Sequence, residues 1–258
     1  MSQLNILFRK RINIPEHEHL TFESLETVLT RTAHSILFEN LCILANNTRP
    51  ISIENLINKI LVNQEGGLCY ELNSILYLFL IENGFDAVLA RGVVYNGAIQ
   101  DYLPIGRTHV TILVTHNDQT YVIDTGFGAN LPLKPVPLSG DVVISSNGEF
   151  RIKKAANRHG DYVLELKLKH KDTDWRIGYC FDSTKPITDV SELDEVQTII
   201  VEHEESPFNK NRLVTRLTAD GNVTLTDTSF TQWADGNVTK EEIDFERYKN
   251  LLKQHFEM

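Results

Sequence analysis

Cys69 is the residue whose type and surroundings best fit a nucleophile. It follows the glycine pair Gly66–Gly67 and precedes a run with helical periodicity, so we expect it at the start of a helix. The glycines permit a tight backbone turn. Unpaired N–H groups and the positive dipole end at a helix start favour thiolate, the reactive form of cysteine, over thiol.

A cysteine nucleophile needs an imidazole beside it and a third group on the other ring nitrogen. His109 begins a predicted strand, and a hairpin at Asn117–Asp118 returns the chain to Asp124. With a turn centred near residue 117, His109 and Asp124 are predicted to lie directly opposite each other, where Cβ atoms are about 4.5–5.5 Å apart. That spacing predicts a hydrogen bond between the imidazole and the carboxylate.

The elements that position these residues follow from the hydrophobic period. A helical period covers residues 22–32, 53–62 and 70–82. From residue 85 onward, short β-branched runs between turn residues predict an antiparallel barrel or sandwich. The predicted strands cover residues 88–95, 109–115, 121–124, 142–145, 162–168 and 175–181. A capping box of Thr239 and Glu242 predicts a closing helix from there to about His255.

Bulk properties limit the function classes. The 258 residues are 41% hydrophobic and 23% charged, as in ordinary globular proteins, and the net charge of −10 disfavours non-specific nucleic-acid binding. Three cysteines imply no disulfide framework, and we find no signal peptide, transmembrane run or zinc-ligand spacing. We therefore expect a cytoplasmic protein without a metal. Arg151, Lys153, Lys154 and Arg158 form a candidate patch for an anionic ligand.

With these residues the sequence resembles the arylamine N-acetyltransferase family. It carries the family's Gly-Gly-x-Cys segment at residues 66–69, its barrel histidine at His109 and its Asp-x-Gly-Phe-Gly segment at residues 124–128. A Phe-Glu-Asn-Leu segment stands at residues 38–41, and a late Ser-Pro stretch from Ser206 matches loosely. The five segments occur in order and at the expected spacing over nearly the whole chain.

The resemblance implies an α+β fold with a Cys-His-Asp triad as in cysteine proteases. It consists of a helical domain with the nucleophile (residues 1–84), an antiparallel β-barrel with the histidine and aspartate (85–195) and an α/β lid (196–258). The implied reaction moves acetyl from acetyl-CoA to the nitrogen of an arylamine or arylhydrazine, or to the oxygen of an N-hydroxyarylamine, as in xenobiotic metabolism. It is a ping-pong cycle through a thioester on Cys69, in which His109 takes the thiol proton and Asp124 fixes the histidine tautomer.

The resemblance also implies binding residues. The backbone of the Gly126–Phe127–Gly128 loop would offer N–H groups to the coenzyme A pyrophosphate. The implied cofactor-binding residues are Thr108, Gly126, Phe127 and Gly128, and the implied acceptor-binding residues are Phe38, Val94, Phe127 and Phe208. The expected partners are thus coenzyme A and small aromatic amines or hydrazines, with no nucleic acid and no membrane.

The chain departs from the family at the residue before the glycine pair. The family usually has arginine there, expected to pair with the glutamate of the Phe-Glu-Asn segment, whereas this chain has Glu65. Two carboxylates, Glu65 and Glu39, would repel each other. Either Glu65 faces solvent, or another cation such as Lys59 or Arg49 pairs with Glu39.

Two other classes fit part of the pattern. Cys, His and Asp in this order also occur in papain-like and transglutaminase-like hydrolases. Papain-type sequences separate Cys and His by more than a hundred residues, whereas the gap here is 109 − 69 = 40, so the transglutaminase-like class is the closer one. A non-catalytic small-molecule binding protein of the same fold is the other alternative, and retention of the whole triad argues against it.

Overall fold

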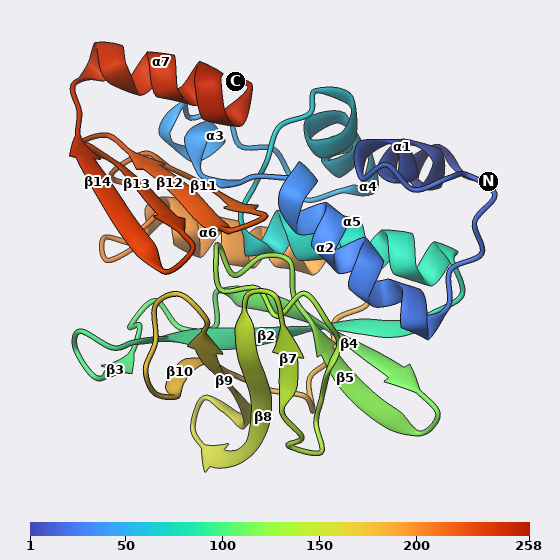
Figure 1. The fold of residues 1–258 in the computed structure, drawn as a ribbon. Coiled ribbons are helices and arrows are strands. Elements are labelled where there is room, and N and C mark those ends of the chain that lie inside the picture. Colours follow the sequence, from blue (N-terminus) through green and yellow to red (C-terminus); the bar gives the residue numbers. More distant parts are fainter.

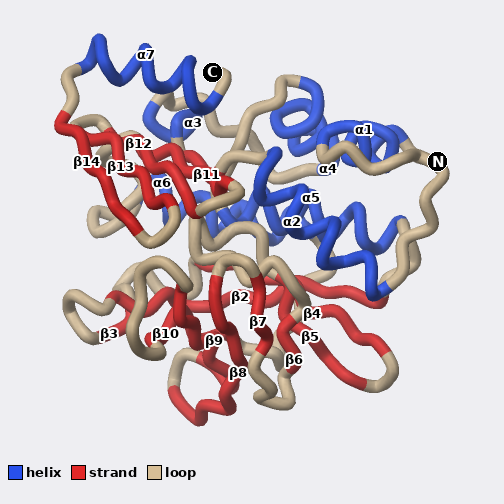
Figure 2. Tube along the Cα trace, viewed as in Figure 1, coloured by secondary structure: helices blue, strands red, loops and turns tan.

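In the computed structural model, a β-barrel packs under a layer of helices and a second, smaller sheet (Figure 1). The structure describes residues 1–258, apart from the side chain of Ala156. Figure 2 shows helices gathered beside the second sheet and strands forming the lower half of the molecule. In the described part of the chain, no helix combines the length and apolar character needed to cross a membrane.

The three predicted helices are confirmed, with changes at their ends. Residues 22–32 form a 3₁₀ turn followed by an α-helix, and residues 53–62 form one α-helical turn followed by a π-helix. The α-helices are α1 (Gln3–Arg11), α2 (Leu25–Ser35), α3 (Leu41–Leu44), α4 (Ile53–Leu56), α5 (Cys69–Glu82), α6 (Asp194–Glu202) and α7 (Phe245–Phe256). The other helical segments are the 3₁₀ turns η1 (Phe22–Ser24) and η3 (Val190–Leu193) and the π-helix η2 (Ile57–Val62).

Helix α5 is the centre of the molecule. All of its residues from Cys69 to Leu80 are buried, the polar Glu71, Asn73 and Ser74 included. It packs on strands β2 (Asp86–Asn96) and β4 (His109–His116) on one side and on α1 and α4 on the other. The helical layer and the barrel therefore share one hydrophobic core, and the first residue of α5 lies where they meet.

The barrel is an antiparallel sheet with the strand order β6-β5-β4-β2-β10-β9-β8-β7, and β3 pairs with β2. It is nearly closed, because β6 also contacts β8. All six predicted strands are present, most of them longer than predicted. The strands not yet given are β3 (Asp101–Tyr102), β5 (Gln119–Ile123), β6 (Val136–Pro137), β7 (Val143–Ser145), β8 (Gly148–Asn157), β9 (Gly160–Leu168) and β10 (Arg176–Phe181).

The second sheet joins the two ends of the chain. Its order is β1-β11-β12-β13-β14, and Phe38 of β1 (Phe38–Glu39) pairs with Thr215 of β11. The remaining strands are β11 (Leu213–Thr218), β12 (Gly221–Thr226), β13 (Ser229–Ala234) and β14 (Asn237–Glu242). The first and last predicted domains thus share a sheet, and the exact domain division stays a prediction.

The predicted capping box at Thr239 is wrong. Thr239 and Glu242 lie in β14, because the turn at Asp235–Gly236 returns the chain along β13 and pairing with β13 outweighs the local helix signal. Helix α7 begins after Asp244, whose side chain accepts a hydrogen bond from the backbone N–H of Arg247 at 2.8 Å.

Candidate active site

Cys69 is the first residue of α5, as predicted, and it is 5% exposed. Its Sγ atom lies 3.4 Å from the carbonyl oxygen of Thr108, which immediately precedes His109. The turn before it is fixed by backbone hydrogen bonds from Gly67 to Leu37 and from Glu39 to Gly67. The helix N-terminus therefore presents the thiol to the start of β4.

His109 and Asp124 form the predicted hydrogen bond, with 2.7 Å between Nε2 and Oδ2. Both side chains are almost completely buried. The carboxylate also accepts hydrogen bonds from the backbone N–H of Gly126 at 2.8 Å, the amide of Asn73 at 2.9 Å and the hydroxyl of Tyr179 at 2.8 Å. Four donors thus hold Asp124 in one orientation, and the imidazole keeps Nδ1 free for another partner.

The prediction that His109 and Asp124 lie directly opposite each other on neighbouring strands is wrong. The ladder pairs Ile112 with Ile123, so the position of Asp124 corresponds to Thr111, while His109 pairs with Gly92 of β2. His109 lies two residues from Thr111 and therefore on the same face of the sheet. The two side chains meet as diagonal rather than direct neighbours, a separation that long side chains can span.

The protonation of His109 is set by its neighbours. Burial by itself lowers the pKa of the imidazole, but the charge and hydrogen bond of Asp124 outweigh it, and Cys69 acts in the same direction. Together they raise the pKa of His109 from its ordinary value of 6.5 to about 10. The site therefore favours imidazolium, the form that pairs with a thiolate.

A cavity of about 390 Å³ opens onto Cys69 and His109. All seven residues predicted to bind the cofactor or the acceptor line it: Phe38, Val94, Thr108, Gly126, Phe127, Gly128 and Phe208. Asp124 lies behind His109 and is not part of the wall. The aromatic lining of the cavity includes Phe38 and Phe208, whose ring centroids are 5.8 Å apart in an edge-to-face arrangement.

Sequence reasoning missed several residues of the site. Asn73 lies one helical turn after Cys69, so the spacing along α5 could have indicated it. Tyr179, Lys171 and Trp233 had no local signal, because each comes from a strand or turn far along the chain.

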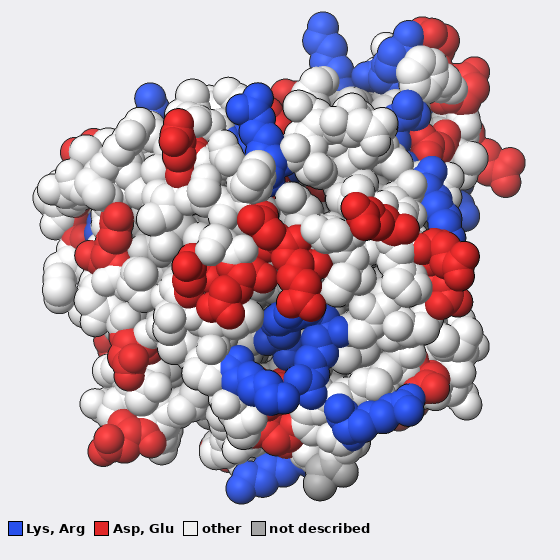
Figure 3. Space-filling model, turned by 180° about the vertical axis from the view of Figure 1, so that it is seen from behind, with Lys and Arg blue, Asp and Glu red and all other residues white. Residues whose placement is uncertain are grey.

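None of the four residues of the predicted anion patch lines the cavity, and two of them are held in ion pairs. Arg151 and Lys153 both pair with Glu165, at 2.7 and 3.0 Å, and Arg151 stacks on Trp175. Figure 3 likewise shows basic side chains gathered directly beside acidic ones on the face opposite to that of Figure 1. Among the described residues that line the cavity, Lys171 is the one lysine or arginine.

The departure at Glu65 is resolved by Lys59. Lys59 Nζ lies 2.6 Å from Glu71 Oε1 and 3.9 Å from Glu39 Oε1, both carboxylates being buried. Glu65 accepts a hydrogen bond from the side chain of Asn63 at 3.1 Å. Of the two substitute cations that the sequence suggested, Lys59 is therefore the one that pairs with Glu39.

Comparisons with known proteins agree with this geometry. A family model described as N-acetyltransferase matches residues 21–258. A solved arylamine N-acetyltransferase C from Bacillus anthracis is 40% identical and superposes with a TM-score of 0.94 over 100% of this chain and 99% of that one. This chain belongs to the arylamine N-acetyltransferase family. It is accordingly an acetyltransferase.

Two further relatives place it within that family. The "probable arylamine N-acetyltransferase 2" of Dictyostelium discoideum is 30% identical over 98% of this chain and 91% of its own length. A Bacillus cereus arylamine N-acetyltransferase is 42% identical, with a TM-score of 0.91 over 98% of this chain and 97% of that one, and is described as having a unique Cys-His-Glu catalytic triad. This arylamine N-acetyltransferase has aspartate, Asp124, hydrogen-bonded to its histidine.

Proposed function

We propose that Cys69, His109 and Asp124 are the catalytic triad of this arylamine N-acetyltransferase. The observation that carries the proposal is the buried His109–Asp124 hydrogen bond of 2.7 Å beside Cys69, at the cavity wall. Asp124 holds the imidazole through Nε2, so Nδ1 can accept the thiol proton. The thiolate then attacks the acetyl carbonyl, and the proton on His109 passes to the departing coenzyme A sulfur.

The second half of the cycle transfers the acetyl group to the acceptor. The amine attacks the thioester carbonyl, His109 accepts its proton, and the sulfur of Cys69 leaves as thiolate. The acceptor's aromatic ring packs between Phe38, Phe127 and Phe208, with Val94 beside them, which makes small aromatic amines and hydrazines the substrate class. N-hydroxyarylamines present an oxygen nucleophile in the same position.

We propose that the donor's phosphates bind at the backbone of Gly126–Phe127–Gly128, with Thr108 beside it. This segment lines the cavity, and Lys171 supplies a cation on the same wall. Gly128 has a φ of +59°, a left-handed conformation that aims successive N–H groups differently from a strand. Because a thiol nucleophile must stay reduced, we place the enzyme in the cytoplasm, where it would acetylate foreign aromatic amines.

The test is the intact mass of the protein after brief mixing with acetyl-CoA, with Cys69→Ala as the matched control. We expect one acetyl group on the wild type, none on the variant, and loss of the adduct when an arylamine or arylhydrazine is added. Acetylation that persists in Cys69→Ala would remove this residue from the mechanism. Cleavage of a peptide or amide substrate without acetyl transfer would favour the transglutaminase-like hydrolase instead.

A further inference from the structure

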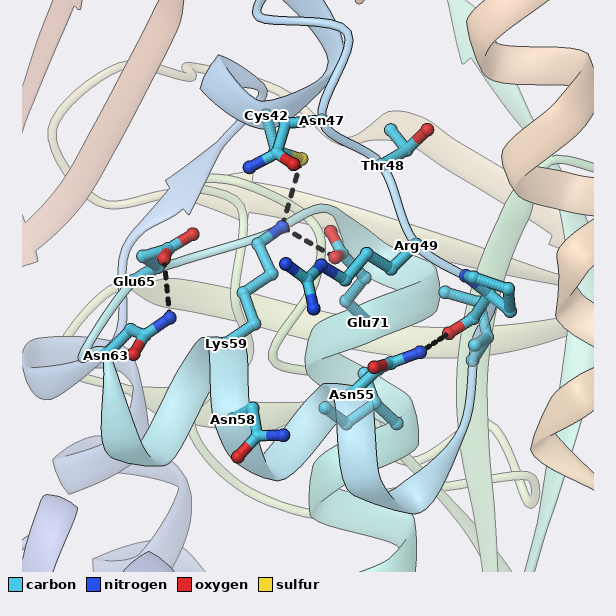
Figure 4. A pocket seen from close by; sticks show the side chains of 13 residues that line it. Cys42, Asn47, Thr48, Arg49, Asn55, Asn58, Lys59, Asn63, Glu65 and Glu71 are labelled. Atoms are coloured by element: carbon cyan, nitrogen blue, oxygen red, sulfur yellow. Dashed lines mark hydrogen bonds and ion pairs between the residues drawn. The ribbon is translucent and has the colours of Figure 1, made fainter.

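A second cavity, of about 280 Å³, is lined by Glu65 and Glu71, which flank the nucleophile turn in sequence, and not by Cys69 (Figure 4). Lys59, from η2, extends into it and makes contacts with Cys42 and Glu71, marked by dashed lines. The distances from Nζ are 3.1 Å to Cys42 Sγ and 2.6 Å to Glu71 Oε1. The proposed acetyl-transfer mechanism assigns no role to this partly buried cation.

Glu39 and Glu71, the two carboxylates that pair with Lys59, each pack against one residue of the glycine pair. Glu71 Oε2 accepts the backbone N–H of Leu68 at 3.1 Å, and a Cβ on Gly67 would lie only 2.7 Å from that oxygen. On the other side, a Cβ on Gly66 would lie 2.8 Å from Glu39 Cγ. The turn before Cys69 therefore lies between two acidic side chains, and one ammonium group holds both.

The charge of Glu71 works against a thiolate at the same helix start. Glu71 lies two residues after Cys69, in the first turn of α5, and its negative charge opposes the positive potential that the helix N-terminus supplies. We propose that Lys59 is a positioning residue for Cys69: it fixes the nucleophile turn and cancels the charge of Glu71 there. The inference rests on the proposed role of Cys69 as nucleophile.

The groups that face Lys59 come from several elements. They are Glu39 of β1, Glu71 of α5 and Cys42 of α3, with Arg49 and Glu65 on the same cavity wall. Burial lowers the pKa of Lys59, but Glu71 and Glu39 outweigh it and raise the pKa above the ordinary value, so the ammonium stays charged.

The groups that face Cys69 are His109 and the phenols Tyr70 and Tyr179. Burial raises the pKa of both phenols well above the ordinary value, so they stay neutral. Burial also raises the pKa of Cys42 to about 11. Burial raises the pKa of Cys180 as well, and peptide mass assigns each adduct to its own cysteine.

The experiment measures the rate of alkylation by iodoacetamide against pH, with the adduct located on Cys69 by peptide mass. For Lys59→Gln we expect the midpoint to rise by about one pH unit, which lowers the rate about tenfold at any pH below the wild-type midpoint. Lys59→Arg should restore the wild-type profile. Lys249→Gln removes a lysine that pairs with Glu246 at 2.7 Å on α7, and it should leave the profile unchanged.

An unchanged midpoint in a folded Lys59→Gln protein would overturn the proposal and leave Lys59 a purely structural role. If that variant does not fold, Glu71→Gln gives the complementary test, with a midpoint expected to fall because the opposing charge is gone; a rise would also overturn the proposal. Alkylation needs no acetyl donor. A failure here is therefore distinguishable from a failure of the proposed acetyl transfer, which the intact-mass experiment reads separately.

Discussion

At the scale of single residues, Asp124 determines the state of the site. A buried carboxylate costs free energy unless it is paired and hydrogen-bonded, and Asp124 has four donors that include a potential cation. The charge and hydrogen bond of Asp124 in turn raise the pKa of His109, which favours the imidazolium form. Asp124, which does not line the cavity, thus sets the protonation of His109, which does.

Asp124→Asn should lower the rate of acetyl-enzyme formation by about 10³- to 10⁴-fold, as seen when an amide replaces the third member of a triad.

The His109–Asp124 pair should also make stability depend on pH. The pKa of His109 is about 10 in the folded protein, above its unfolded value of 6.5. The pair therefore stabilises the fold fully below about pH 6.5, and this contribution is lost as pH rises through about 10. Urea unfolding at pH 6 and pH 10 checks it: the stability advantage of the wild type over Asp124→Asn should shrink at the higher pH. An advantage independent of pH would contradict the pairing.

Tyr179→Phe tests the hydrogen bonding that supports the proposed triad. The variant removes one of the four donors to Asp124 while keeping the ring, which packs 4.2 Å from the His109 ring, centroid to centroid. A lost hydrogen bond to a charged group is worth about 1.5–3 kcal/mol, so we expect roughly a tenfold or greater fall in kcat. Stopped-flow kinetics of enzyme acetylation measure this fall. An unchanged rate would contradict the role of the Tyr179 hydroxyl in supporting Asp124.

At the scale of elements, α5 aligns the nucleophile with the barrel. Asn73, one turn after Cys69, donates to the carbonyl of Val110 at 2.7 Å and accepts from the N–H of Thr125 at 2.9 Å. One side chain thereby ties the helix to β4 and to the loop after β5. The loop can approach α5 because residue 126 is glycine: a Cβ there would lie 2.5 Å from the Cα of Cys69.

Gly126→Ala should therefore push the helix and loop apart. The clash is with backbone and cannot be relieved by a rotamer change, so we expect a loss of stability of about 1–3 kcal/mol together with a large loss of activity. Gly97→Ala is the matched control, because nothing lies within 4 Å of its added Cβ. Thermal unfolding and acetyl transfer of the two variants give the comparison, and similar behaviour of both would contradict the close approach.

At the scale of the whole molecule, Asn40 holds the second sheet against the helical layer. It is fully buried, donates to the carbonyls of Phe208 and Asn211 at 2.8 Å each, and accepts from the N–H of Leu213 at 2.8 Å. The Phe-Glu-Asn segment thus has three distinct tasks. Phe38 lines the cavity, Glu39 pairs with Lys59, and Asn40 fixes the segment that carries Phe208.

Asn40→Ala should loosen that segment. Three backbone groups lose the hydrogen-bond partner that the buried Asn40 side chain supplies, and we expect urea unfolding to show about 3 kcal/mol of destabilisation. The KM for the arylamine should rise more than kcat falls, because Phe208 forms part of the wall and not of the triad. Asn58→Ala, at an exposed helical position, should change stability by less than about 0.5 kcal/mol. A KM equal to that of the wild type would show that the segment stays in place without Asn40.

The sequence by itself determined what depends on neighbours along the chain. The 3.6-residue period predicted α5, and the glycine pair predicted its start at Cys69. Alternation along the strands placed His109 and Asp124 on one face, and that survives the register error because a shift of two residues keeps the face. The motif order predicted the family and the residues that line the cavity.

Tertiary structure alone decided the contacts between distant segments. The register of the β4–β5 hairpin is the exception, because it follows from the local two-residue turn in which Asn117 and Asp118 both have positive φ, 49° and 59°. Thr239 became part of a strand because β13 offers a full ladder of hydrogen bonds, which a single capping interaction cannot match. Lys59 replaced the expected arginine because η2 brings its ammonium group to two buried carboxylates. Such pairings are chosen by burial and charge in the folded chain, and residues far apart in sequence leave no local pattern that records them.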